Sequence, residues 1–203
     1  MRYVLTTFFV FCLLALASGC GGASKSLAGG GNGPSPNNMG AAQEKTPDGL
    51  ISEKSDLNGD GKIDVVVFST EVKEKGNKIL KIPVRKEIDL NGDGRVDVTQ
   101  YFDERGDITK EELDLDFDGR VDKIVKYQKG KIESEELSSL FDGKFDVRRY
   151  FEDGVLVLKQ IDTKRTGIFD EFQYYLGNKL ARIGWDRDGD GKPEIFEENP
   201  AVE

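Results

Sequence analysis

The sequence contains no histidine and only two cysteines, Cys12 and Cys20, which both lie near the N-terminus. Residues 21–203 therefore have neither an imidazole nor a thiol. Zinc sites, Ser-His nucleophile systems and Cys-His hydrolases are excluded for this part of the chain. Disulfide bonds are excluded as well, even in an oxidising compartment. These absences remove several common classes of enzyme.

Long apolar runs are also lacking, except at the very start. Met1 to Ala17 combines one positive charge, Arg2, with a stretch rich in Phe, Leu and Val. This stretch is too short to predict a transmembrane helix and is typical of a secretory signal. The run ends in Leu16-Ala17-Ser18-Gly19-Cys20, which resembles the bacterial lipobox, with Ala17 at the place where leucine is usual.

The lipobox resemblance implies that residues 1–19 are a lipoprotein signal peptide and that Cys20 is acylated and becomes the new N-terminus. Gly21, rather than an aspartate, follows the cysteine. In Gram-negative lipoproteins this implies export to the outer membrane, so the expected partner is the lipid bilayer, reached through acylated Cys20. The alternative is a cleaved signal with an incidental cysteine.

Residues 20–50 are rich in Gly, Ser, Asn, Pro and Ala and show no apolar periodicity, which predicts a flexible tether. Residues 51–203 are about the size of one domain. The formal net charge is −9, and the acids are concentrated in four short loops, which carry 14 of the 38 Asp and Glu residues. An acidic surface of this kind repels nucleic acid, so no nucleic-acid partner is expected.

One nine-residue pattern recurs four times, with oxygen-bearing side chains at alternate positions followed by a glycine. It is clearest in Asp89-Leu-Asn91-Gly-Asp93-Gly-Arg-Val-Asp97. The other copies begin at Asp56, Asp114 and Asp186. Hard cations such as Ca²⁺ take six to eight oxygen ligands, which acids at this spacing can supply. Asp, Asn and Gly also form turns without metal, but a turn needs only one or two such residues.

The loops resemble those of EF-hands, dockerins and thrombospondin type 3 repeats, over about nine residues in each copy. The resemblance concerns the loop and not the fold. It implies bound Ca²⁺, with side-chain oxygens at four or five places and a backbone carbonyl from the basic residue in each loop. The implied metal ligands are Asp56, Asn58, Asp60, Lys62, Asp64, Asp89, Asn91, Asp93, Arg95, Asp97, Asp114, Asp116, Asp118, Arg120, Asp122, Asp186, Asp188, Asp190, Lys192 and Glu194.

EF-hands also have an acid at the twelfth place, on a helix that leaves the loop. Only the loop at Asp186 has one, Glu197. A strand is favoured after this loop, because Pro193 fixes φ and the other loops are expected to lead into strands. A strand would turn Glu197 away from the ion. One helical turn would instead make Glu197 a ligand. Because the first three loops lack this acid, they are expected to bind calcium weakly, with Kd roughly 10⁻⁴ to 10⁻³ M.

The loops belong to a repeat of about twenty-four residues, which continues with a short apolar run, aromatic residues and a glycine turn. About seven residues separate loop and turn, which suits a strand and not a helix. The sequence therefore predicts an all-β fold of tandem hairpins, either an antiparallel meander or a solenoid-like sheet. Glycine turns are expected at Gly106, Gly130, Gly154 and Gly177. Residues 138–146 and 162–170 keep only fragments of the metal pattern and are expected to be plain turns.

Two functions fit this organisation. The first is a calcium-stabilised, non-enzymatic envelope lipoprotein that presents a β-repeat surface to other envelope proteins or to surface polysaccharide. The second is a hydrolase that cleaves envelope polysaccharide with a carboxylate pair, which needs no histidine. No such pair stands out, because the acids are accounted for by the loops or by strand surfaces. No catalytic residue is therefore predicted.

Overall fold

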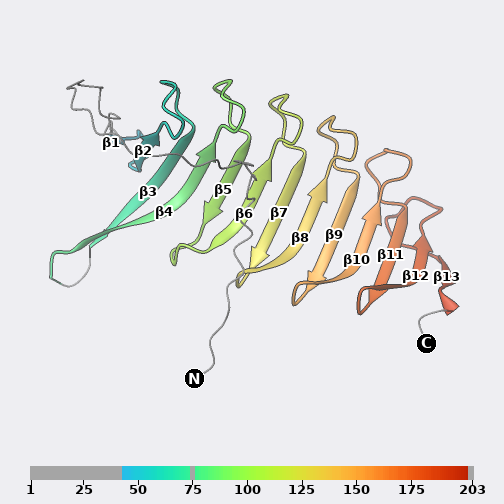
Figure 1. Ribbon diagram of the computed structural model, residues 1–203. Helices are drawn as coiled ribbons and strands as arrows, with labels where there is room; N and C mark the ends of the chain where they lie inside the picture. The colour runs from blue at the N-terminus through green and yellow to red at the C-terminus, as the bar shows by residue number, and fades with distance from the viewer. Residues whose placement is uncertain (1–42, 74–75, 201–203) are drawn as a thin grey trace, which may run out of the picture. The chain divides into compact units, whose positions relative to one another are not determined.

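The computed structural model describes residues 43–73 and 76–200. In this part of the chain thirteen strands form one antiparallel sheet, and each strand pairs only with its neighbours in the sequence (Figure 1). The predicted all-β meander of hairpins is confirmed. The strands are β1 (Gln43–Lys45), β2 (Ile51–Ser55), β3 (Val65–Lys73), β4 (Ile79–Ile88), β5 (Val98–Phe102), β6 (Ile108–Leu113), β7 (Lys123–Gln128), β8 (Lys131–Leu137), β9 (Val147–Glu152), β10 (Val155–Ile161), β11 (Glu171–Leu176), β12 (Lys179–Trp185) and β13 (Ile195–Glu198).

Short turns and longer loops alternate along the chain, so they lie at opposite edges of the sheet (Figure 1). Hairpin β9–β10 turns at Asp153-Gly154, with φ of 52° and 82°. Two successive positive φ angles are what a two-residue hairpin turn requires, and glycine adopts them without steric cost. The predicted glycine turns are confirmed. The edge that carries the nine-residue loops is called the loop edge below.

Each repeat also contains a β-bulge. Between β5 and β6, Tyr101 pairs with Lys110 while Phe102 pairs with Ile108, so Thr109 is an extra residue. The same register shift occurs in the later hairpins. A further shift lies between β3 and β4, where Phe68 pairs with Arg85 and Ser69 with Pro83, so Val84 is the extra residue. Bulges of this kind bend a strand and increase its twist.

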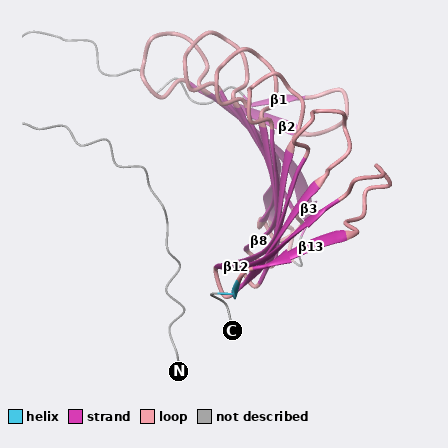
Figure 2. Ribbon diagram, turned by 90° about the vertical axis from the view of Figure 1, so that its right-hand side faces the viewer, coloured by secondary structure: helices cyan, strands magenta, loops and turns pink. Residues whose placement is uncertain are grey.

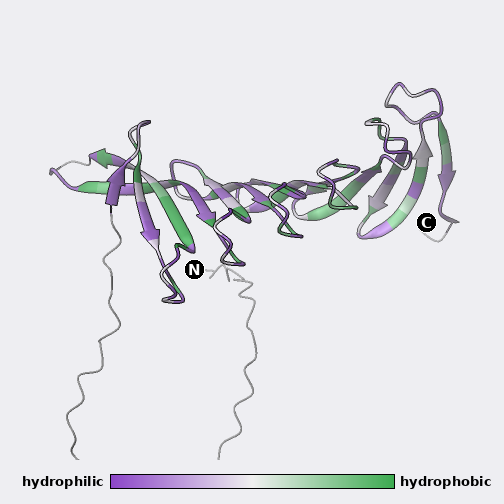
Figure 3. Cartoon of the chain, turned by 90° about the horizontal axis from the view of Figure 1, so that it is seen from above, coloured by the Kyte–Doolittle hydropathy of each residue, from purple (hydrophilic) through white to green (hydrophobic). Residues whose placement is uncertain are grey.

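The sheet is a single layer over the described residues (Figure 2), and its hydrophobic core is small. Only Val65, Val125, Val147 and Phe172 are buried apolar residues in this part of the chain. Apolar and polar residues are mixed along the strands, as Figure 3 shows. Cross-strand ion pairs supplement this packing, for example Lys123 and Arg149 on either side of Glu135, at 3.0 and 3.2 Å.

The sheet begins earlier than the expected domain boundary at residue 51, because β1 lies within the segment predicted as tether. Gln43 pairs with Glu53 and Lys45 with Ile51. All three residues of β1 are exposed, so backbone hydrogen bonding to β2 holds the strand and no apolar pattern marks it. Among the described residues, no helix has the length and apolar character needed to cross a membrane.

Candidate metal centre

Six loops on the loop edge share one backbone framework: residues 56–64, 89–97, 114–122, 138–146, 162–170 and 186–194. In each, the fourth and the sixth residue adopt a left-handed conformation. The fourth is glycine in three loops but Phe117, Phe141 or Arg165 in the others, with φ between 55° and 64°. Such angles are uncommon for residues other than glycine. The two degenerate loops are therefore full copies of the framework and not the plain turns expected from the sequence.

The first residue of a loop binds the loop's own backbone. Asp89 accepts hydrogen bonds from the N–H groups of Gly92 and Gly94, both at 2.7 Å. Burial raises the pKa of Asp89, but these N–H groups outweigh it and leave the pKa below its usual value. Asp56 and Asp186 bind their loops in the same way. The carboxylate at this position is thus fixed by the backbone of its own loop.

In the loops at Asp89 and Asp114, the ninth residue closes the loop and leaves one oxygen without a partner. The Oδ2 atom of Asp97 accepts hydrogen bonds from Leu90 and Asn91 at 2.6 and 3.2 Å, and Oδ2 of Asp122 accepts one from Leu115 at 2.9 Å. These two aspartates are 2 % and 0 % exposed. Their Oδ1 atoms are buried and have no hydrogen-bond partner. A buried carboxylate oxygen without a partner is costly, and a cation in the loop would remove that cost.

The loop at Asp114 gathers three acids. One carboxylate oxygen each of Asp114, Asp116 and Asp122 lies within 4.8 Å of the others. Burial and the charge of Asp118, followed by the charges of Asp122 and Asp114, raise the pKa of Asp116. Asp118 itself lies outside the group, because it is held by the Arg120 guanidinium, with Nε 2.7 Å from Oδ2. That ion pair lowers the pKa of Asp118.

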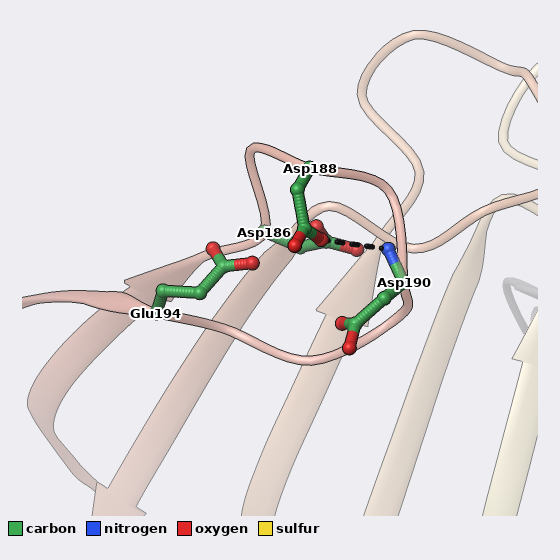
Figure 4. A group of neighbouring side chains, drawn as sticks. All are labelled: Asp186, Asp188, Asp190 and Glu194. Atoms are coloured by element: carbon green, nitrogen blue, oxygen red, sulfur yellow. Dashed lines mark hydrogen bonds between the residues drawn. The ribbon is translucent and has the colours of Figure 1, made fainter.

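The loop at Asp186 brings together all four of its predicted side-chain ligands (Figure 4). Asp186, Asp188, Asp190 and Glu194 offer oxygens within 4.8 Å of one another. The Asp190 N–H donates to Oδ1 of Asp188 at 3.0 Å. Glu197 is not part of the group. It lies on β13, where it pairs with Ile183, so the strand favoured for this segment is confirmed.

The loops at Asp56 and Asp89 have an asparagine at the third place. Asn91 Oδ1 accepts from the Asp93 N–H, and Asp93 Oδ1 accepts from the Arg95 N–H, both at 2.8 Å. The loop at Asp56 has the same pair of bonds. Neither of these loops is among the groups of three close acids found in the described residues. An ion in them would rely on asparagine and carbonyl oxygens as well as on the acids.

Neighbouring loops are joined to each other. The N–H of the first residue of one loop donates to the carbonyl of the ninth residue of the loop before it, as in Asp89 to Asp64 (2.9 Å) and Asp114 to Asp97 (2.8 Å). The basic seventh residues also bridge loops. Arg95 donates to the Asp118 carbonyl at 3.3 Å, and Lys62 donates to the Gly92 carbonyl. These contacts link each loop to the next along the loop edge.

The loops 138–146 and 162–170 hold cations of the protein itself. The Arg165 guanidinium binds Asp146 at 2.9 Å and Asp142 at 2.6 Å. Lys164 pairs with Asp170 at 3.0 Å. These contacts were not predicted from the sequence. The available signal was that both loops keep an acid at the ninth place although they are otherwise poor in acids, and that residues 162–170 have two adjacent basic residues, Lys164 and Arg165.

In two of the four predicted loops, those at Asp114 and Asp186, the acids lie close enough to share an ion. Buried carboxylate oxygens without a partner occur at Asp97 and Asp122, the ninth residues of the loops at Asp89 and Asp114. The acidic groups in the described part of the chain could thus hold a metal ion. Cys20 lies outside the described residues.

Comparison with known proteins adds little. No family model matches the chain, and no characterised protein matches it. A solved structure described as "Crystal structure of accessory secretory protein 1,2 and 3 in Streptococcus pneumoniae" aligns at 17% identity with a TM-score of 0.35. The alignment covers 55% of this chain and 19% of that chain. At this TM-score the likeness carries no argument about fold or function.

Proposed function

We propose that this protein is a calcium-stabilised, non-enzymatic lipoprotein of the bacterial outer membrane. In this proposal Cys20 is the lipid anchor, and the β-repeat sheet is the surface used for adhesion or for assembly with envelope proteins or polysaccharide. The observation that carries the calcium part is the pair of buried, unpartnered oxygens at Asp97 and Asp122. They belong to loops that offer only oxygen donors.

Calcium suits these loops better than other common ions. Residues 21–203 contain neither histidine nor cysteine, which disfavours zinc and copper, because these metals prefer nitrogen and sulfur ligands. Magnesium demands near-ideal octahedral geometry and usually keeps several waters, whereas calcium accepts irregular sets of carboxylate and carbonyl oxygens. A nine-residue loop with alternating donors is such an irregular set.

The ion would act on stability. A metal that binds only the folded state adds RT ln(1 + [L]/Kd), and it also relieves repulsion between acids such as Asp114 and Asp116. Because the described sheet has few buried apolar residues, this contribution would be a large part of the total. The proposed role of the metal is therefore to hold the display surface in one shape.

The test is calcium titration of the purified chain, followed by thermal melts in chelator and in millimolar calcium. We expect Tm to rise with calcium, and an unchanged Tm would reject the proposal. Magnesium at the same concentration is the control for ion identity. For the anchor, wild type should fractionate with membranes and Cys20→Ala should not. Pull-downs from envelope membranes, with and without chelator, would identify the partner.

The alternative is a hydrolase that acts on polysaccharide. The groove lined by residues 128–129, 131–133 and 151–153 contains Glu133, Glu152 and Asp153 and is the place where a carboxylate pair would be sought. Asp153 is already paired with Lys131 at 3.0 Å. Glu133→Gln and Glu152→Gln would abolish hydrolysis under this alternative and change nothing under the favoured one.

A further inference from the structure

The loops at Asp56 and Asp89 contain a chemically labile dipeptide at their third and fourth places. These are Asn58-Gly59 and Asn91-Gly92, the two Asn-Gly pairs of residues 43–73 and 76–200. Both asparagines are exposed. In such a pair the backbone nitrogen of glycine can attack Cγ of the asparagine side chain, because glycine has no Cβ to hinder the approach.

The reaction is a deamidation that needs only water. The glycine nitrogen gives up its proton and forms a bond to Cγ, the side-chain nitrogen leaves as ammonia, and a succinimide ring remains. Water then opens the ring at either of its two carbonyls. One opening leaves aspartate, and the other leaves isoaspartate, in which the chain continues through the side-chain carbon and the backbone is longer.

In the folded loops the attacking N–H is already bound to a carboxylate. The Gly92 N–H donates to Oδ1 of Asp89 at 2.7 Å, and the Gly59 N–H donates to Oδ1 of Asp56 at 2.6 Å. Hydrogen bonds of this charge-assisted kind are among the strong ones. Loss of the proton would break the bond and place a second negative charge beside the carboxylate, which is unfavourable. The closed loop therefore suppresses the nucleophile.

The amide that would be attacked is held as well. Oδ1 of Asn91 accepts from the Asp93 N–H at 2.8 Å, and Oδ1 of Asn58 accepts from the Asp60 N–H at 2.9 Å. Ring closure needs freedom of the asparagine side chain and of the peptide that follows it. Both are restricted here, so exposure to water does not by itself make these asparagines reactive.

We propose that Asn58 and Asn91 are deamidation sites that the closed loops protect, with Asp56 and Asp89 as the protecting residues. Modification then occurs when a loop opens. The aspartate product adds a negative charge to a loop that is already acidic, and the isoaspartate product lengthens its backbone, so both disfavour the closed form. This inference is independent of the proposed calcium binding, because the protecting hydrogen bonds lie within the protein.

The experiment incubates the purified full chain in chelator at mildly alkaline pH, both native and unfolded in urea. Deamidation at each site is followed over time by mass spectrometry of proteolytic peptides, and isoaspartate is measured by enzymatic methylation. The test variants are Asp89→Ala and Asp56→Ala, and in each the asparagine of the other loop is the internal control. Asp186→Ala is a further control, because it removes the first aspartate of a loop that has no asparagine.

We expect both asparagines of the native wild type to react more slowly than in urea by roughly tenfold or more, the effect of one hydrogen bond to a charged group. Asp89→Ala should remove this protection at Asn91 and leave Asn58 unchanged, Asp56→Ala should do the reverse, and Asp186→Ala should change neither. Equal rates in native and unfolded wild type would overturn the inference without reference to any variant. Acceleration at both asparagines by a single variant would also overturn it, because the protection would then belong to the whole fold and not to the aspartate of each loop.

Discussion

The loops 89–97 and 114–122 differ from the loops 138–146 and 162–170 in how their acids are neutralised. The first two keep a buried oxygen without a partner, at Asp97 and Asp122. In the other two the ninth residues, Asp146 and Asp170, are paired with Arg165 and Lys164. The backbone framework is the same in all four loops.

If calcium binds as proposed, the same framework accepts two kinds of cation. A metal ion or a guanidinium can each satisfy a buried carboxylate, but only the guanidinium belongs to the protein and is always present. The middle of the sheet is therefore expected to be stable without metal. The loops on either side of it are expected to depend on calcium, and this contrast can be tested directly.

The largest expected effect comes from removing the metal. At calcium about ten times Kd, each bound loop gains about 1.4 kcal/mol, so several loops together gain several kcal/mol. Hydrogen exchange should accelerate in chelator at residues 56–64, 89–97, 114–122 and 186–194. Residues 138–146 and 162–170 should change much less. Uniform acceleration across all six loops would break the comparison.

The next effect is expected from Arg165→Met, which leaves Asp146 buried without its cation. The free energy of unfolding in chelator should fall by about 1–3 kcal/mol, because an uncompensated buried charge remains. Calcium should restore part of this loss, since Asp142 and Asp146 become available to an ion. Thermal melts in chelator and in calcium measure both changes. Lys144→Met, in the loop of Asp142 and Asp146 but without a described ion pair, is the control.

The same variant also predicts a pH dependence. The Lys144 N–H and then Arg165 hold the pKa of Asp142 below its ordinary value of 3.8. A lowered pKa stabilises the fold above about pH 3.8, and this contribution is lost as the pH falls through the folded-state value. The stability difference between wild type and Arg165→Met should therefore shrink in acid. NMR titration of Asp142 should show a higher pKa in the variant, and an unchanged pKa would contradict this account.

A smaller and more specific effect is expected from Asp122→Asn. In chelator the free energy of unfolding should change by less than about 1 kcal/mol, because the variant loses a buried charge whose Oδ1 atom had no partner, while the amide oxygen of asparagine can still accept from the Leu115 N–H. In calcium the variant should lose the gain of its loop, about 1.4 kcal/mol at ten times Kd. Asp146→Asn is the matched control and should lose stability equally in both conditions. If the two variants behave alike, the distinction between metal-bound and arginine-bound loops is wrong.

The smallest effect is expected at Glu197. It lies on β13 and outside the group formed by Asp186, Asp188, Asp190 and Glu194. Glu197→Gln should therefore leave calcium affinity unchanged in a titration followed by calorimetry. Glu194→Gln, within the group, should weaken it clearly. A loss of affinity with Glu197→Gln would show that the end of the chain rearranges when metal binds.

Local features of this protein were determined by the sequence alone. The spacing of Asp, Asn and Gly predicts loops in which side chains accept hydrogen bonds from the backbone a few residues later, as Asp89 does from Gly92 and Gly94. Short apolar runs between loop and glycine turn predict strands, and their repetition predicts a meander. These interactions join residues close in sequence, so the sequence of a single repeat is enough to predict its loop and its strands.

Only the tertiary structure decided which acids are buried and how they are neutralised. The burial of Asp97 depends on the next loop, whose Asp114 N–H binds the Asp97 carbonyl. Arg165 reaches Asp142 and Asp146 in the preceding loop. The extra residue of each bulge, such as Thr109, is likewise defined only by its pairing across strands. These features arise between neighbouring repeats, about twenty-four residues apart, because the sheet places them side by side.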